Sequence, residues 1–264
     1  SNHEVLGILL DSCHTLEKLS LNSVTLNERM ISSISVQNGK TLTVLRLNGC
    51  NRLLGLGFLN ILSQEELTLK HVKPIADYCT ELRELDISHC LISEEAMDYL
   101  ANNLSPNTFK LCFRGINRIQ DHQVKMLVSR CNKITEFNLC STEVNNDSVT
   151  YIIKHLHSTL EKLDLTHTNT TLNKLFDLKY LKKLTCLNWR KFHGGIEALK
   201  KHLPSTHIDT QINKQIGELS IGRKIVVANS WKQTLLTFRN YELMSDSSEY
   251  EVGKRKDLRF CKVE

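Results

Sequence analysis

The sequence is poor in aromatic residues and proline, and it contains no long hydrophobic run. Aromatic residues make up 6% of its 264 residues, and only 3 residues are proline. The longest apolar runs are far shorter than the roughly 20 residues that a membrane helix needs, so we expect no membrane partner. The first residues contain no basic stretch followed by an apolar core, so no secretion signal is visible.

Charge and cysteine content exclude further classes. The net charge is +5 with both signs interspersed, which is weak support for nucleic-acid binding, and we expect no nucleic-acid partner. The hydrophobic fraction of 41% argues against a disordered chain. Nine cysteines are an odd number in a chain without a secretion signal. This favours reduced, buried thiols over disulfides.

Leucine, in contrast, is abundant and follows a repeated pattern. The spacing L-x-x-L-x-L recurs along the chain, as in Leu42, Leu45 and Leu47. Four of the seven intervals between its copies are 26 residues long, and one is 40. A single repeat of this size cannot close its own core, so such repeats stack into a solenoid. The middle position of the pattern falls at Leu19, Leu45, Leu85, Leu111, Phe137, Leu163, Leu187 and Thr206.

The segments between these motifs have helical periodicity. One helix is expected from Asp121 to Cys131 with Asp121 as its N-cap, and another after Ser93, a good N-cap. A third is expected at 146–157. Five cysteines keep a fixed phase to the strand motifs, which is typical of packing residues: Cys13, Cys50, Cys79, Cys90 and Cys131. We therefore predict an α/β fold, a right-handed leucine-rich-repeat solenoid of the cysteine-containing type, with about 26 residues per repeat. Its parallel strands line the concave face, and its helices cover the convex face.

Three regions are predicted along the chain. Residues 1–210 form the solenoid of about eight repeats, with an insertion near 51–79 that forms a helical turn or a loop. Residues 211–240 alternate apolar residues with glycines, which predicts an extended segment that packs back on the solenoid. Residues 241–264 carry an acidic serine cluster and a basic run, and we expect them to be mobile. The chain begins with the helix of a repeat whose strand is missing, so we expect an upstream segment.

The repeats resemble the cysteine-containing leucine-rich repeats of F-box proteins. The motifs that carry the resemblance include Leu-Asn-Gly-Cys at 47–50, Ile-Ser-His-Cys at 87–90 and Leu-Val-Ser-Arg-Cys at 127–131. The resemblance covers roughly residues 5–235. It departs from the family at the insertion and in the F-box itself, because nothing in this chain reads as that module.

The resemblance implies the substrate-recognition subunit of an SCF-type ubiquitin ligase, located in the cytoplasm and nucleus. Its partners would be a phosphorylated cell-cycle protein and a small cyclin-dependent-kinase subunit. The F-box adaptor and the cullin would be reached only through an upstream F-box. We expect no cofactor and no metal. The alternative is a leucine-rich-repeat scaffold or inhibitor that binds a protein without ubiquitin chemistry.

Strand alternation places candidate contact residues on the concave face. The column between the two strand leucines runs from Ser20 through Arg46, Asp86, Cys112, Asn138, Asp164 and Asn188 to His207. Arginine forks two hydrogen bonds to a phosphate or carboxylate, so basic residues near the later strands predict an acidic partner. We predict partner contacts at His89, Arg114, Arg118, Ser141, Lys162, His167, Arg190 and Lys191.

A catalytic role is not predicted. A nucleophilic cysteine needs a neighbouring base and a lowered pKa. Cys112, Cys140 and Cys186 are expected on the concave face, and no histidine shares a motif with them. We expect a binding subunit without catalytic residues of its own.

Overall fold

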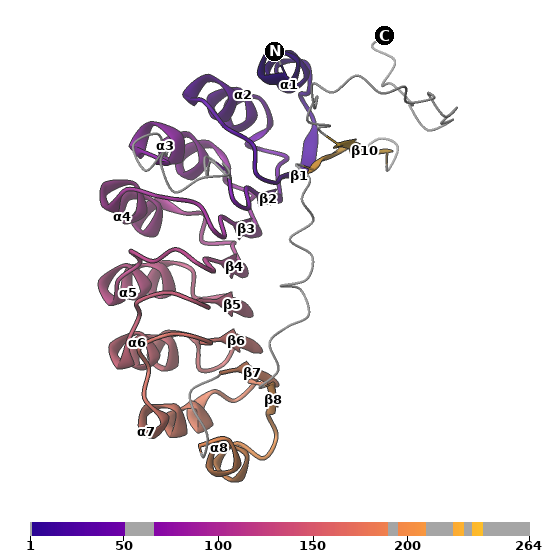
Figure 1. Cartoon of the computed structure of the whole chain (residues 1–264). Helices are drawn as coiled ribbons and strands as arrows, with labels where there is room; N and C mark the ends of the chain where they lie inside the picture. The colour runs from indigo at the N-terminus through magenta and orange to yellow at the C-terminus, as the bar shows by residue number, and fades with distance from the viewer. Residues whose placement is uncertain (1, 51–65, 190–194, 210–223, 230–233, 240–264) are drawn as a thin grey trace, which may run out of the picture.

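The computed structural model describes residues 2–50, 66–189, 195–209, 224–229 and 234–239. Short strands alternate with helices along the chain and build a curved solenoid (Figure 1). The strands line its inner side and the helices cover its outer side. None of the described helices combines the length and apolar character that crossing a membrane requires.

Eight parallel strands form the inner layer, and most are only three residues long. They pair in chain order, so each repeat contributes one strand next to the previous one. The strands are β1 (Leu16–Leu21), β2 (Val44–Arg46), β3 (Glu84–Asp86), β4 (Lys110–Cys112), β5 (Glu136–Asn138), β6 (Lys162–Asp164), β7 (Cys186–Asn188) and β8 (His207–Asp209).

The helices of the outer layer run between these strands. The predicted stripe of apolar residues faces the sheet, as Val124, Leu127 and Val128 do. The helices are α1 (Asn2–Asp11), α2 (Glu28–Asn38), α3 (Leu69–Tyr78), α4 (Glu94–Asn103), α5 (Asp121–Arg130), α6 (Asn146–Leu156), α7 (Leu172–Leu175), the 3-10 helix η2 (Phe176–Tyr180) and α8 (Ile196–His202).

The strand register confirms the repeat pattern except at its last copy. Leu19, Leu45 and Leu85 are register partners in successive strands, and the same position continues to Leu187 in β7. In β8 the partner of Leu187 is Ile208. The prediction placed Thr206 there and was wrong by two residues, because the leucine of this short repeat belongs to the end of α8. His207 therefore lies in the column of Cys186.

Helix caps agree with the sequence in one case and not in another. The Ser93 side chain accepts a hydrogen bond from the Ala96 N–H and caps α4, as predicted. Asp121 was predicted to cap α5, but the N-cap is Gln120. The Asp121 carboxylate is used elsewhere, since it accepts hydrogen bonds from Asn145 and Ser148 at the start of the next helix.

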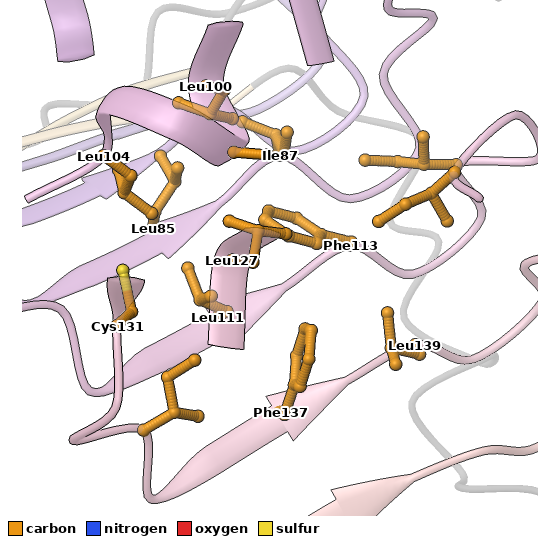
Figure 2. Close-up of a cluster of buried hydrophobic side chains, with 14 of the residues drawn as sticks. Leu85, Ile87, Leu100, Leu104, Leu111, Phe113, Leu127, Cys131, Phe137 and Leu139 are labelled. Atoms are coloured by element: carbon orange, nitrogen blue, oxygen red, sulfur yellow. The ribbon is translucent and has the colours of Figure 1, made fainter. Parts of the chain in front are cut away.

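The core is one continuous cluster between the sheet and the helices (Figure 2). Leucines of neighbouring strands stack in register, and helix leucines such as Leu127 cover them. Phe113 and Phe137 meet edge to face with their ring centroids 6.0 Å apart. Burial of this kind stabilises by roughly 1.5–3 kcal/mol per large apolar side chain.

The cysteines in phase with the repeat pack in this core. Cys50, Cys79, Cys90 and Cys131 are buried free thiols, as predicted, whereas Cys13 is half-buried. The thiol of Cys90 donates a hydrogen bond of 2.8 Å to the carbonyl of Leu47 in the preceding repeat. Burial raises the pKa of Cys50 and of Cys131 to about 12, so these thiols stay protonated.

Two further strands extend the sheet at its N-terminal edge. β9 (Lys224–Asn229) pairs antiparallel with β1, and β10 (Thr234–Arg239) pairs antiparallel with β9. The C-terminal part of the chain thus returns to the first repeat and covers the edge that β1 would expose. Most of the predicted insertion near 51–79 and all of 241–264 lie outside the described residues.

Candidate binding surface

The concave face of the sheet carries a hollow of about 380 Å³ that spans β2 to β7. Side chains at alternate strand positions point into it, because their neighbours point into the core. The lining residues are Arg46, Glu84, Leu85, Asp86, Lys110, Leu111, Cys112, Glu136, Phe137, Asn138, Lys162, Leu163, Asp164, Cys186 and Asn188.

One column of this face, together with Arg46 from the next column, forms a ladder of ion pairs. We call Arg46, Glu84, Lys110, Glu136 and Lys162 the charge ladder. Arg46 pairs with Glu84 at 2.6 Å, and Glu136 accepts from Lys110 at 3.1 Å and from Lys162 at 3.0 Å. Partial burial favours a higher pKa for Glu136, but the hydrogen bonds from the two lysines outweigh it and lower its pKa. The same bond to Glu136 raises the pKa of Lys162. Each basic residue of the ladder therefore already has a carboxylate partner, and the three cations share two carboxylates.

The neighbouring column has a different role. We call Asp86, Cys112, Asn138 and Asp164 the central column. Asp86, Asn138 and Asp164 each accept a hydrogen bond from the backbone N–H two residues later, at 2.9, 2.9 and 3.0 Å. Each of these bonds turns the chain sharply as it leaves the strand. The side chains therefore hold the turn while they line the hollow.

The next residue in each turn has a left-handed backbone. His89, Ser141 and His167 have φ values of 59°, 57° and 56°, and Gly115 has 72°. The N–H groups of His89, Gly115 and Ser141 donate to carbonyls of the next repeat, as His89 does to the Arg114 carbonyl at 2.7 Å. Three predicted contact residues, His89, Ser141 and His167, thus lie at a conformationally demanding backbone position. The turn therefore supplies a structural reason for these residues that is independent of any partner contact. Sequence reasoning did not find this reason.

The remaining predicted contact residues are scattered. Arg114 is half-buried at the end of β4, and its Nε has no hydrogen-bond partner among the described residues. Arg118 pairs with Glu66 at 2.9 Å. Lys162 belongs to the charge ladder. Arg190 and Lys191 lie outside the described residues. Only two members of the predicted basic cluster, Arg114 and Arg118, are among the described residues, so the cluster as a whole stays a prediction.

Sequence reasoning placed Asp86 and Asp164 on the concave face but counted no acidic residue among the predicted contacts. Glu84, Asp86, Glu136 and Asp164 line the hollow as fully as the lysines do. The available signal was the recurrence of Asp or Asn at the same position of several repeats.

Neither Cys112 nor Cys140 has the lowered pKa of an activated thiol. Burial raises the pKa of Cys112 to about 12, and the Cys112 Sγ lies 3.0 Å from the Ser88 hydroxyl. Cys140 was predicted on the concave face, but it is only 3% exposed in the turn that follows β5. Within the described ranges, no group of three or more His, Cys, Asp or Glu side chains is arranged to hold a metal ion.

Two solved structures share this fold. An internalin of Listeria monocytogenes superposes with a TM-score of 0.50 at 15% identity, over 78% of this chain and 54% of its own. A chain of the yeast Rad7 and Elc1 complex gives a TM-score of 0.51 at 15% identity, over 70% and 44%. Our chain spans about half of their length. No protein-family model and no curated protein matches the sequence. The repeat geometry and these structures identify the fold as a leucine-rich-repeat solenoid.

Proposed function

We propose that the protein is the substrate-recognition subunit of an SCF-type ubiquitin ligase and has no catalytic residues of its own. The observation that carries the binding role is the continuous polar concave face over β2 to β7. Solenoids use such faces to hold protein partners. The ligase context rests on the motifs at 47–50, 87–90 and 127–131, which look most like those of the S-phase kinase-associated F-box protein.

The partner would be a phosphorylated cell-cycle protein, bound alone or with a small cyclin-dependent-kinase subunit. The contact residues would lie at the strand ends and in the turns that follow them. Arg114 is the strongest of these, because its guanidinium has no ion pair among the described residues. The other proposed contacts are His89, Arg118, Ser141, Lys162, His167, Arg190 and Lys191.

The ligase role is tested on the full-length gene product. We expect affinity capture from cells to recover the F-box adaptor and the cullin, together with ubiquitinated forms of a bound protein. Capture of a stable partner without the adaptor would instead support the alternative, a repeat scaffold without ubiquitin chemistry. The yeast Rad7 and Elc1 complex favours neither outcome, because it shows only that a protein of this fold forms a complex.

The contact surface is tested by charge reversal. Arg114→Glu should reduce partner capture at least tenfold, because an arginine–phosphate fork would become a repulsive pair. Lys154→Glu in α6, exposed on the convex side, is the matched control and should leave capture unchanged. Equal capture by both variants, with unchanged thermal stability, would remove Arg114 from the interface.

A further inference from the structure

We propose that the central column docks an extended protein segment carrying two cationic side chains four residues apart. One cation would lie against Asp86 and the other against Asp164. The proposal rests on the proposed protein-binding role of the concave face and names the chemistry of the partner there. It differs from the acidic partner that the basic residues of the sequence suggest.

The charges of the concave face are paired unevenly between the charge ladder and the central column. Asp86 and Asp164 have no ion pair among the described residues, although Arg46 is the register neighbour of Asp86. Arg46 turns to Glu84 instead, and both ladder lysines turn to Glu136. Each cation of the ladder therefore already has a carboxylate partner, whereas Asp86 and Asp164 have no cationic partner among the described residues.

The turns do not require the negative charges of Asp86 and Asp164. Asn138 occupies the same position in β5 and accepts the same backbone hydrogen bond, at 2.9 Å. A neutral amide is therefore sufficient to hold the turn. The turn geometry explains an Asp or Asn at 86 and 164 but leaves the choice of the charged residue unexplained.

The carboxylate of Asp164 is also buried. Asp164 is 8% exposed, and its second oxygen accepts only a long hydrogen bond of 3.3 Å from the Asn188 amide. A carboxylate this far from water is poorly screened and gains most from an incoming cation. The hollow of about 380 Å³ lies beside it.

Strand spacing sets the pattern of the partner. Asp86 lies on β3 and Asp164 on β6, three strands along the sheet. Neighbouring strands are about 4.8 Å apart, so the two carboxylates are about 14 Å apart along the solenoid. An extended segment rises about 3.3 Å per residue and covers this distance in about four residues. Cys112 and Asn138 lie between the carboxylates and are uncharged, so the intervening partner residues need no charge.

An acidic segment fits this face less well. Lys110 and Lys162 both already pair with Glu136, so an acidic segment would compete with this carboxylate for them. It would also lie beside Asp86 and Asp164. Like charges at this distance are costly where water is partly excluded.

The proposal is tested with the whole chain and three fluorescent peptides of equal length. The first has lysines at positions i and i+4, the second has the same lysines side by side, and the third has glutamates at i and i+4. Binding is measured by fluorescence anisotropy at low and at physiological salt. We expect the first peptide to bind at least tenfold more tightly than the other two, with salt weakening it.

Variants identify the site of binding. Asp86→Asn with Asp164→Asn should weaken the first peptide at least tenfold, and Asn138→Asp should strengthen binding by adding a carboxylate between them. All three substitutions preserve the turn hydrogen bond, so loss of folding is not the expected result, and circular dichroism verifies this. Equal binding of the three peptides, or no effect of the double substitution, would overturn the proposal.

The outcome is separable from that of the ligase proposal. If the basic peptide binds through Asp86 and Asp164 but the full-length protein captures no adaptor, this inference stands and the ligase role fails. If adaptor and partner are captured equally by the double variant and the native chain, the ligase role stands and this inference fails.

Discussion

The two sides of the same strands differ sharply. In β5, Phe137 points into the core and is 2% exposed, whereas Glu136 and Asn138 on either side of it line the concave hollow. The core-facing side of the strands is apolar in every repeat. The concave side alternates acidic, basic, amide and thiol side chains. Packing of the core therefore depends on one side of the sheet, and the residues of the other side are free of this constraint. The following predictions test this separation, from the largest expected effect to the smallest.

The largest effect on stability is expected on the core-facing side of the strands. Phe137→Ala should reduce the free energy of unfolding by about 3–5 kcal/mol, because it opens a cavity and removes the edge contact with Phe113. Urea denaturation followed by circular dichroism measures this. Phe137→Leu is the control and should lose much less. A loss below about 1 kcal/mol for the alanine variant would show that the core tolerates voids at this position.

An intermediate effect is expected in the turns between the two sides. Gly115 and Gly49 both have positive φ, of 72° and 63°. Alanine at either position should cost about 1–2 kcal/mol for the left-handed backbone. Gly115→Ala should cost more, because its Cβ would clash with the His89 imidazole, whereas at Gly49 the nearest atom is the Ser23 hydroxyl at 3.3 Å. Identical losses for the two variants would mean that His89 moves aside freely.

A small, pH-dependent effect is expected in the charge ladder. The pKa of Glu136 is lowered in the folded protein, so its stabilising contribution is complete above pH about 4.5 and is lost as the pH falls through the lowered pKa. Glu136 is partly exposed, so the contribution is less than about 1 kcal/mol. The stability difference between the native chain and Glu136→Gln should shrink from pH 7 to pH 3 in denaturation experiments. A difference that does not change with pH would place its origin outside the ion pairs.

The smallest effect on stability is expected in the central column. Asp86→Asn should change the free energy of unfolding by less than about 0.5 kcal/mol, because Asn138 makes the same turn bond. Asp86→Ala is the control and should cost more, since it leaves the Ser88 N–H without this acceptor. Thermal denaturation of the two variants decides whether the acceptor or the charge matters for folding.

Most of the fold was predictable from the sequence. The leucine spacing located seven of the eight strands and their register, because each strand must present the same apolar face to the core. The last repeat was misplaced because it is short and its apolar residues, Leu203 and Ile208, fit two registers. The Asp121 cap was misassigned, since its carboxylate serves the start of α6 instead.

The candidate surface was less predictable. Strand alternation predicted which residues form the columns of the concave face. It did not predict which charged side chains are left without an ion pair. Lys162 looked like a basic contact residue in the sequence and is paired with Glu136 in the fold. Arg118 is near Arg114 in the sequence but pairs with Glu66. Pairing across repeats depends on side-chain direction, which spacing alone does not determine.

The sequence by itself determined the repeat length, the inward leucines and the alternation that exposes every second strand residue. These follow from local periodicity and from the need to bury apolar surface. Only the tertiary structure decided that Arg46 neutralises Glu84, 38 residues away, while Asp86 beside it has no counter-ion among the described residues. It also decided that β9 joins the first strand rather than the last. Such choices depend on which repeats become neighbours in space, and that is established only when the solenoid stacks.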